Sequence, residues 1–357
     1  MEADFLVIGG GIAGTSVGAR LAELGRVVLV EAEPALGYHA SGRSAALFEV
    51  SYGLPATLAL NRASADWFHA SGLLAPRGLM LVGGPGQEDR FAADAAAMGL
   101  TPLTPADARA MVPILHPETA TLTAWHDAAW DIDTDRMIQA FAREVRASGE
   151  VVQGARVSAI RRTRDGWAVT AGGREITARV LVNAAGAWAD GVAEMAGIGP
   201  LGIRPMRRSM ARLAAPGGHD VSGWPMLLGV GEDWYAKPDA GALLVSPAEE
   251  EPSPPMDAWA DDMVLAEGLA RYEAHVTEPV TRPLATWAGL RSFAPYRTLV
   301  LGPDPRDAAF VWMAGQGGYG FQTAPAASRL VADRVAGRTP VLEAAEVAAL
   351  APDRFVA

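Results

Sequence analysis

The first part of the chain restricts the fold more than any other. The stretch DFLVIGGGIAGTSVGARLAELGRVVLVEAE contains an apolar run at 5–8, a glycine turn, apolar residues at helical spacing, and a second apolar run at 27–30. This order predicts a strand, a turn, a helix and a strand, which together form a dinucleotide-binding unit. Gly9 permits the tight turn, Gly11 lets the backbone approach a pyrophosphate at the helix N-terminus, and Gly14 lets the helix pack closely on the strand.

An acid at the end of the second strand indicates which nucleotide is bound. Glu31 follows Gly14 by 17 residues. A carboxylate at this position accepts hydrogen bonds from a ribose diol and repels a 2′-phosphate, which disfavours NADP. The glycine pattern alone is weak, but two flanking strands and this acid make it specific.

Two later segments favour FAD over NAD. In REITARVLVNAAGAWAD (174–190), a predicted strand at 180–183 runs into small residues that let the backbone pass close to a nucleotide. The segment before it predicts hairpins that turn at 165–166 and 172–173. Near the C-terminus, FVWMAGQGGYGFQTAPAASRLVADRV (310–335) repeats the order of strand, glycine turn and helix. The start of such a helix suits a flavin carbonyl that gains negative charge on reduction.

These segments, with SGRSAA (41–46), LVNAAGAW (181–188), WAGLRSF (287–293) and GQGGYGFQT (315–323), resemble the D-amino-acid oxidase/glycine oxidase superfamily of FAD enzymes. The resemblance covers nearly the whole chain and is closest to D-arginine dehydrogenase-type D-amino-acid dehydrogenases. It implies non-covalent FAD. Val157 and Trp188 have core packing as an alternative role. The residues that the resemblance places around FAD are Gly9, Gly11, Ile12, Ala13, Gly14, Glu31, Ala32, Ser41, Gly42, Arg43, Ser44, Ala45, Ala46, Val157, Ala184, Ala185, Gly186, Trp188, Gly289, Arg291, Gly317, Gly318, Tyr319, Gly320, Phe321, Gln322 and Thr323.

The expected fold class is α/β, with a discontinuous Rossmann-like FAD-binding domain and an α+β substrate domain whose sheet is mostly antiparallel. The FAD domain is assigned to residues 1–75, 140–204 and 286–357, and the substrate domain to 76–139 and 205–285. A helix is expected to start at 133 or 134. The acidic, proline-rich stretch PAEEEPSPPMD (247–257) is expected to be a solvated loop without chemistry.

Two arginines in apolar, strand-like surroundings are candidates for binding a substrate carboxylate. They are Arg208 and Arg291, and a buried guanidinium needs a partner such as a carboxylate held as a bidentate fork. Strand alternation leaves open whether Arg207 or Arg208 faces inward, and Arg208 is favoured. The resemblance gives both candidates this role. It adds the hydroxyls of Tyr52 and Tyr235, which are otherwise core tyrosines, and the carbonyl of Gly318 as an acceptor for the amine.

The side-chain pocket is assigned to Leu47, Glu49, Leu79, Met226 and Leu228. Enzymes of the D-arginine dehydrogenase type would be expected to carry a histidine at the position of Leu47 and an acid at that of Leu79. Burying a cationic side chain against leucines would leave a charge unpaired, so a neutral, apolar or aromatic substrate is predicted. Glu49 either points into the pocket and favours a polar or cationic side chain on the substrate, or forms the solvent-facing side of a mobile loop, which is the favoured prediction.

The expected reaction is oxidative deamination of a free amino acid, with hydride transfer from the α-carbon to the flavin N5. Sarcosine oxidase-type sites keep a lysine near the flavin for oxygen, but the corresponding strand at 241–246 has none. The only lysine of the chain is Lys237. A dehydrogenase using a quinone is therefore favoured, with oxygen as the other possible acceptor. The alternatives are a glycine or sarcosine-type oxidase and a non-catalytic flavoprotein subunit.

Composition narrows the partners. The net charge of −11 disfavours nucleic acid and anionic membrane surfaces. The absence of cysteine excludes disulfides, thiolate metal sites and a cysteinyl flavin link. The six histidines lack metal-ligand spacing, so no metal is expected. No run of about 18 apolar residues is present, so no membrane span is expected, and a cytoplasmic location is predicted.

Overall fold

The computed structural model describes residues 1–355 and has an α/β fold built on two large sheets. The first sheet has eight strands. Their order is β10 (Val157–Thr163), β11 (Gly166–Ala171), β12 (Arg174–Asn183), β1 (Glu2–Ile8), β2 (Val27–Val30) and β9 (Glu150–Val152), with β20 (Asp307–Ala314) joining β12 to β19 (Val300–Asp304).

The strands at the centre of this sheet are parallel. β1 pairs with β2 on one edge and with β12 on the other, and the last residues of β12 pair with β20. The carboxyl ends of these four strands therefore meet at one edge, which is where open α/β sheets bind ligands. The sequence predicted the second strand at its observed bounds and the two hairpins that connect β10, β11 and β12.

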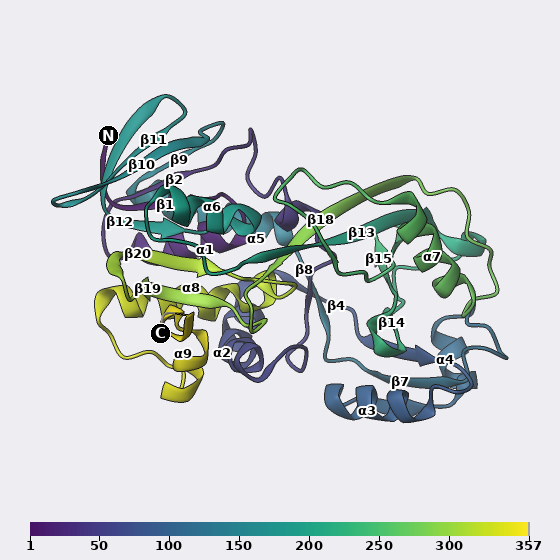
Figure 1. Cartoon of the computed structure of the whole chain (residues 1–357). Coiled ribbons are helices and arrows are strands. Elements are labelled where there is room, and N and C mark those ends of the chain that lie inside the picture. Colours follow the sequence, from purple (N-terminus) through teal and green to yellow (C-terminus); the bar gives the residue numbers. More distant parts are fainter. Residues whose placement is uncertain (356–357) are drawn as a thin grey trace.

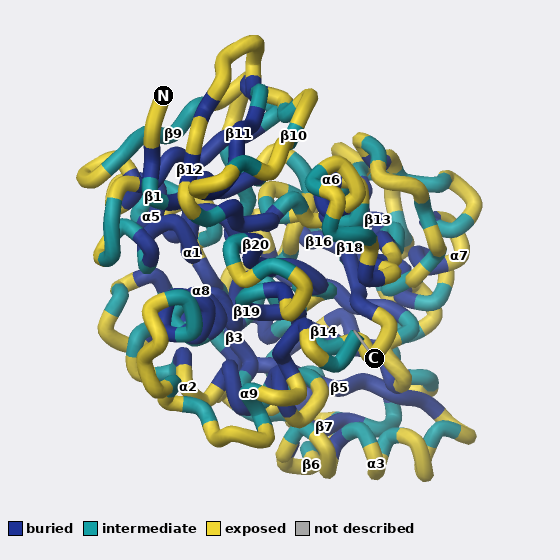
Figure 2. The backbone as a smooth tube through the Cα atoms, turned by 60° about the vertical axis from the view of Figure 1, so that its left-hand side comes forward, coloured by how far each residue is buried: buried dark blue, intermediate teal, exposed yellow. Residues whose placement is uncertain are grey.

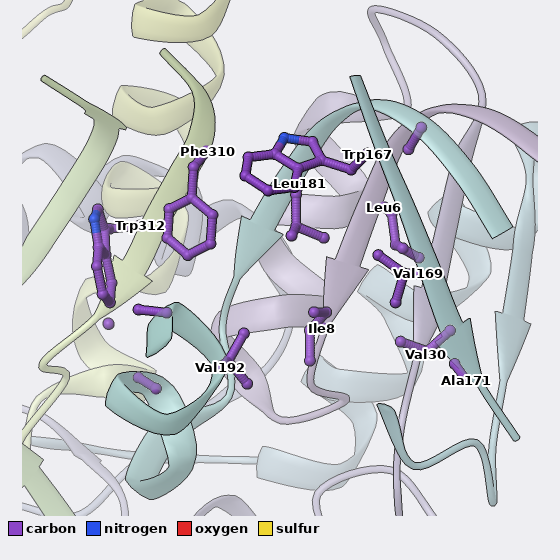
Figure 3. Close-up of a cluster of buried hydrophobic side chains, with 14 of the residues drawn as sticks. Leu6, Ile8, Val30, Trp167, Val169, Ala171, Leu181, Val192, Phe310 and Trp312 are labelled. Atoms are coloured by element: carbon purple, nitrogen blue, oxygen red, sulfur yellow. The ribbon is translucent and has the colours of Figure 1, made fainter. Parts of the chain in front are cut away.

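Helices cover both faces of the first sheet. α1 (Ile12–Leu21), α5 (Thr134–Ser148) and α8 (Gly320–Ala336) pack together on one face, and α2 (Pro55–Ser71) packs against α8. The predicted start of α5 is confirmed, since Asp133 caps it by accepting a hydrogen bond from the backbone N–H of Arg136 at 3.1 Å. On the other face, Trp167, Phe310 and Trp312 form a core with short helix α6 (Ala189–Met195), as Figure 3 shows.

The second sheet has nine strands and is antiparallel except where β14 pairs with β5. It is accompanied by α3 (Glu88–Met98), α4 (Pro105–Met111) and α7 (Asp262–Glu273). Its order is β17 (Glu251–Pro252), β13 (Arg204–Ala214), β16 (Ala242–Ser246), β15 (Tyr235–Asp239), β14 (Met226–Gly229), β5 (Leu79–Gly83), β7 (Leu122–His126) and β6 (Thr101–Leu103), with β18 (Ala285–Phe293) on the other edge of β13.

The half that contains the first sheet is assembled from separated segments. Figure 1 shows purple, teal and yellow segments together on the left, and mainly blue and green strands on the right. The expected fold class is confirmed, including the mostly antiparallel second sheet. β18 lies wholly in that second sheet, so by sheet membership the last segment of the first half begins after Phe293 rather than at 286.

A small three-stranded sheet includes the residues that directly follow the SGRSAA segment. It consists of β3 (Leu47–Phe48), β8 (Trp130–Ile132) and β4 (Leu74–Pro76). Central strands of the molecule are buried, and exposure concentrates in outer turns and helix faces (Figure 2). Within residues 1–355, no helix has both the length and the apolar character needed to cross a bilayer. α9 (Ala344–Leu350) packs beside α2 near the C-terminal end.

Candidate functional site

A cavity of about 430 Å³ lies at the carboxyl edge of the first sheet. Residues at the ends of β1, β2 and β12 line it, together with the start of α1, the turn before α8, and strands β13, β15 and β18 of the second sheet. The cavity is therefore shared by both halves of the molecule. This is the position expected for a nucleotide whose reactive end faces a substrate site.

Two glycines of the first turn are required by close packing. Gly9 has φ +111°, and a Cβ there would lie 2.4 Å from the carbonyl oxygen of Ala184. A Cβ on Gly14 would lie 1.9 Å from the carbonyl oxygen of Gly9. Any side chain at either position would separate α1 from the sheet, so the turn keeps the shape that a dinucleotide pyrophosphate needs.

The N-terminus of α1 opens onto the cavity. The backbone N–H of Ile12 donates to Ser41 Oγ at 3.0 Å, and the Ser41 hydroxyl hydrogen stays free to donate to a phosphate oxygen. Gly11 also lines the cavity. A Cβ added there would approach only the Ser41 side chain, with Oγ at 3.0 Å, and no backbone atom. A second helix start, that of α8, also lines the cavity at Gly320 and Phe321.

Glu31 is buried at the end of β2 and holds the glycine turn. Its Oε2 accepts from the Gly10 N–H at 2.6 Å, and its Oε1 accepts from the Glu33 N–H at 2.8 Å. Each carboxylate oxygen retains a lone pair that can accept a ribose hydroxyl. The polar groups of this cradle fit FAD. Its backbone amides and serine hydroxyl are donors for the pyrophosphate, and its carboxylate is an acceptor for the ribose hydroxyls.

Gln316 is a cavity residue that sequence analysis did not identify. It lies just before the glycine turn that leads into α8, and both polar atoms of its amide are buried without a hydrogen-bond partner among the described residues. Buried amides normally have partners, so this one is suited to the polar edge of a bound group. The only available sequence signal was its place in GQGGYG.

Arg43 lines the cavity, but its guanidinium joins the two halves of the molecule. It donates to the carbonyl oxygens of Ala258 and Ala288 at 2.8 and 2.9 Å, and it forms a short ion pair with Asp257. The resemblance placed Arg43 around FAD, and the residue does line the cavity. Its guanidinium also ties the SGRSAA segment to β18 and to the loop before α7.

Most of the residues expected around FAD surround the cavity, and six do not. Among the six, Gln322 donates to the carbonyl oxygen of Tyr52 at 3.0 Å, and Thr323 donates to the carbonyl oxygen of Tyr319 within α8. The expected residues that line the cavity are Gly9, Gly11, Ile12, Ala13, Glu31, Ala32, Ser41, Arg43, Ser44, Ala45, Val157, Ala184, Ala185, Gly186, Trp188, Gly289, Arg291, Gly317, Gly318, Gly320 and Phe321. Those that do not are Gly14, Gly42, Ala46, Tyr319, Gln322 and Thr323.

Two guanidinium groups face the cavity from adjacent strands. Arg208 of β13 pairs directly with Gly289 of β18, and Arg291 pairs with Met206. Because side chains alternate along a strand, Arg208 and Arg291 lie on the same face as diagonal neighbours, within reach of one another's long side chains. Arg207 faces the other way and forms an ion pair with Glu251.

The two arginines differ in their partners. The Arg208 Nε–H donates to the carbonyl oxygen of Glu249 at 2.8 Å, and Arg208 Nη2 lies 3.4 Å from a carboxylate oxygen of Glu250. Across residues 1–355, no carboxylate forms an ion pair with Arg291. Its guanidinium lies over the Gly318 backbone instead, where a Cβ would be 2.9 Å from Nη1. Of the two guanidinium groups, only that of Arg208 therefore has a carboxylate ion-pair partner among the described residues.

The pKa values reflect this crowding. Burial, followed by the neighbouring charge of Arg291, lowers the pKa of Arg208. Burial alone would also lower the pKa of Arg291, but the surrounding oxygen-bearing side chains, Tyr235 first, raise it overall. Both groups stay cationic at neutral pH, and a bound carboxylate is the complement that the pair lacks.

The prediction of a solvated loop over 247–257 is only partly correct, because several of its residues are exposed while two of its acids pair with arginines of the second sheet. Glu249 accepts a hydrogen bond from the Ser209 N–H at 2.6 Å, and burial raises the pKa of its carboxyl. Glu250 forms ion pairs with Arg208 and Arg297, while residues 251–252 extend the second sheet as β17. The acids of this stretch form ion pairs with arginines that lie about 40 or more positions away in the sequence, and composition cannot reveal such pairs.

Tyr52 lies beside the arginine pair but outside the cavity lining. Its hydroxyl donates to Glu232 Oε2 at 3.0 Å, and burial raises its pKa, with further effects from the charges of Arg291 and Glu232. Glu232 has φ 57°, an unfavourable conformation for a residue with a side chain, and such strain is concentrated at functional sites. Sequence analysis did not identify Glu232, because nothing in GVGEDWY distinguishes it from a surface acid.

The prediction that Glu49 faces solvent is wrong. The residue is 4% exposed, its Oε1 accepts from the Ser51 N–H at 2.9 Å, and its Oε2 lies 3.0 Å from His126 Nε2. It also does not line the cavity. Asn61 of α2 donates to the carbonyl oxygens of Glu49, Val50 and Tyr52, so the loop is anchored from inside.

The expected side-chain pocket forms one apolar cluster next to Tyr235. Leu79 and Leu228 are buried in it, and Leu47 and Met226 pack against them. Tyr235 belongs both to this cluster and to the cavity lining, as does Met210. The leucines and Met226 do not line the cavity themselves but form an apolar wall against Tyr235 and Met210, which do.

Comparison with known proteins agrees with this geometry. The chain matches the family model described as FAD dependent oxidoreductase over residues 4–334. Two curated relatives are each a FAD-dependent oxidoreductase domain-containing protein 1. The one from Bos taurus is 29% identical over 175 residues, 44% of this chain and 35% of the relative. The one from Xenopus laevis is 27% identical over 179 residues, 45% of this chain and 36% of the relative. The match therefore spans only about a third of the length of either relative.

Solved structures resemble this one over almost the whole chain. Glycine oxidase from Geobacillus kaustophilus has a TM-score of 0.82 at 21% identity and covers 97% of this chain and 98% of its own. L-proline dehydrogenase from P. horikoshii has a TM-score of 0.83 at 21% identity, with 99% and 98% covered. An L-α-glycerophosphate oxidase from Mycoplasma pneumoniae, solved with FAD bound, has a TM-score of 0.82 at 16% identity, with 96% and 97% covered. These similarities establish the fold.

Proposed function

Because the chain belongs to the family of FAD-dependent oxidoreductases, we propose that it oxidises a free amino acid at the carbon that bears the amino group. The observation that carries this proposal is the arginine pair. Arg208 and Arg291 face one cavity, and no carboxylate of residues 1–355 forms an ion pair with Arg291. A substrate carboxylate would supply the missing charge.

Binding and orientation are the main work of the protein in this reaction. FAD, when bound, supplies the group that accepts a hydride from the substrate. Arg208 and Arg291 would hold the carboxylate, and the Tyr235 hydroxyl lies at the same wall of the cavity. The carbonyl oxygen of Gly318, beside the Arg291 guanidinium, would accept a hydrogen bond from the amine. Fixing the α-carbon in this way can supply about 7–11 kcal/mol of a reaction barrier.

Loss of the amine proton needs no dedicated base among the side chains of the cavity. The two guanidinium groups remain cationic, and Tyr52 has a raised pKa that keeps its hydroxyl protonated. Neighbouring positive charge and a dry surface both lower the pKa of a bound ammonium. The amine is therefore expected to reach its neutral form on binding.

The apolar wall supports a neutral side chain on the substrate. The residues that cluster with Tyr235 are all apolar, namely Leu47, Leu79, Met226 and Leu228. Glu49, the acid nearest to them in sequence, is buried in contact with His126. A cationic side chain would meet no free carboxylate there and would be costly to bury. We therefore propose a neutral, apolar or aromatic amino acid, and its D-configuration rests on the resemblance to D-amino-acid dehydrogenases alone.

The electron acceptor is proposed to be a quinone rather than oxygen. The ammonium of Lys237, the only lysine, is occupied by the backbone of the SGRSAA segment and by Asp131. A glycine or sarcosine-type oxidase remains the second candidate, since a known glycine oxidase shares the fold. Rapid mixing of the reduced protein with oxygen separates the two, because fast reoxidation would contradict the dehydrogenase.

The substrate proposal is tested by flavin reduction without oxygen. The FAD-loaded protein is mixed with single enantiomers of leucine, methionine, phenylalanine, arginine and lysine, and with glycine and sarcosine, while flavin absorbance is followed. D-Leucine, D-methionine or D-phenylalanine should bleach the flavin fastest. Faster bleaching by D-arginine or D-lysine would contradict the neutral side chain. No bleaching by any amino acid would favour a flavoprotein subunit without turnover of its own.

A further inference from the structure

The only lysine of the chain occupies a buried position beside the cavity. Lys237 is one of 30 basic Lys and Arg residues, and the other 29 are arginines. It lies on β15 two residues after Tyr235, so both side chains project from the same face of the strand. The residue is only 8% exposed, although lysine is rarely buried without a specific partner.

The Lys237 ammonium lies among three oxygens. It donates hydrogen bonds to the carbonyl oxygens of Ala45 and Ala46 at 3.1 and 2.9 Å, and its Nζ forms an ion pair with Asp131 Oδ1 at 2.9 Å. An ammonium is a compact point charge with three N–H donors, whereas a guanidinium is a planar fork. Three oxygens that converge on one point therefore suit lysine better than arginine.

Asp131 is itself fixed from its other side. Arg77 donates from Nε and Nη2 to Asp131 Oδ2 at 2.8 and 2.6 Å, and from Nη1 to two carbonyl oxygens of the segment before β14. Asp131 also lies opposite Leu47 in the small sheet. Lys237 therefore links two parts of the molecule. Its ammonium contacts Asp131, which Arg77 holds in place, and it donates to the backbone of the SGRSAA segment.

The orientation of the Ala45 backbone links this anchor to the cavity. Ala45 lines the cavity and Lys237 does not. Because a trans peptide is planar, its C=O and N–H point in opposite directions. Holding the Ala45 carbonyl at Lys237 therefore turns the N–H of Ala46 away from Lys237. We propose that Lys237 is a positioning residue that fixes the Ala45–Ala46 peptide against the cofactor, an inference that rests on the proposed function.

The proposal is tested with Lys237→Arg and Lys237→Met. Lys237→Arg keeps the charge but not the three-point geometry, so both variants should show a shifted flavin absorption spectrum before any substrate is added. The Kd for FAD, measured by titrating the apoprotein, should rise about tenfold or more in both. The rate constant for flavin reduction at saturating substrate should fall by a similar factor, while the substrate Kd changes little, since the arginine pair is intact.

The matched control is Arg212→Met. Arg212 forms an exposed ion pair with Asp239, which lies on the same strand as Lys237, and its loss should leave all three measurements unchanged. If Lys237→Met does not fold, Lys237→Arg decides alone. A wild-type spectrum, FAD Kd and reduction rate in Lys237→Arg would overturn the positioning role. If no amino acid reduces the wild-type flavin, the proposed function fails, but the spectrum and the FAD titration still test Lys237.

Discussion

Replacing Arg291 with methionine should weaken substrate binding without weakening the fold. Arg291 forms no ion pair with any carboxylate of residues 1–355, and it shares the cavity with the cationic Arg208. Methionine is unbranched and flexible, so its thioether can cover Gly318, over which the guanidinium lies in the wild type. Arg208 repels the Arg291 charge, while the surrounding side chains raise the Arg291 pKa and so favour that charge, and the free energy of unfolding should therefore change little.

The effect on binding is much larger. Truncating one partner of a buried, hydrogen-bonded charge pair costs about 2–5 kcal/mol. At about 1.4 kcal/mol for each factor of ten, the substrate Kd should rise about 30-fold to several thousandfold. The lower figure applies if Arg208 keeps the carboxylate in place, because that guanidinium is held independently by Glu249 and Glu250.

Two measurements check this prediction. The substrate Kd comes from the concentration dependence of flavin reduction without oxygen, and an unreactive carboxylate such as benzoate gives an independent Kd through its effect on the flavin spectrum. Thermal unfolding of the FAD-loaded protein gives the stability. Arg207→Met is the matched control, since Arg207 precedes Arg208 on β13 but pairs with Glu251. Its Kd should stay within about threefold of wild type.

The reasoning would be refuted by either of two results. A substrate Kd within threefold of wild type in Arg291→Met would show that the arginine pair does not bind the carboxylate. A loss of several degrees in Tm with unchanged Kd would show that Arg291 supports the fold rather than the ligand.

Three further changes have expected outcomes. Gly14→Ala places a Cβ 1.9 Å from the Gly9 carbonyl oxygen and should abolish FAD retention after purification, whereas Gly223→Ala, which meets no atom within 4 Å, should not. Glu49→Gln should lower the Tm by weakening the buried contact with His126, yet a substrate screen should show unchanged preference between neutral and basic amino acids. Burial raises the pKa of Glu249, so the stability linked to this carboxyl is present below its ordinary value of 4.5 and is lost as pH rises through the raised pKa. Glu249→Gln should therefore have a higher Tm than wild type at pH 8 and the same Tm at pH 4.

Local patterns were sufficient to predict the nucleotide half of the fold. The packing of Gly14 on the Gly9 carbonyl, the apolar run at 27–30 and the helix cap at Asp133 are local features, for which spacing and side-chain type are informative. Strand alternation required that only one of Arg207 and Arg208 face inward, Arg208 was favoured, and the structure places Arg208 at the cavity and Arg207 outside it.

The failures all involve partners that are distant in sequence. Glu49 looked exposed because His126 lies 77 positions later, and Glu250 and Glu251 looked solvated because they pair with arginines about 40 positions earlier. Gln316 was missed because its polar atoms stand out only when the structure shows that they lack partners. A buried charge is recognised by what it contacts, and a single sequence does not contain that information.

The register of β13 and β18 is the feature that joins the cofactor region to the arginine pair. Gly289 lines the cavity opposite Arg208, and Arg291 follows two residues later on the same face. Two residues of a strand span about 7 Å, so this strand, rather than a loop, sets the distance between Gly289 in the cofactor region and Arg291 of the arginine pair. A slip of one residue would turn Arg291 to the other face, where Leu290 is now buried. In the proposed function, backbone pairing would therefore set the position of the substrate carboxylate, and the loops that carry Tyr52 and Glu232 would complete the site around it.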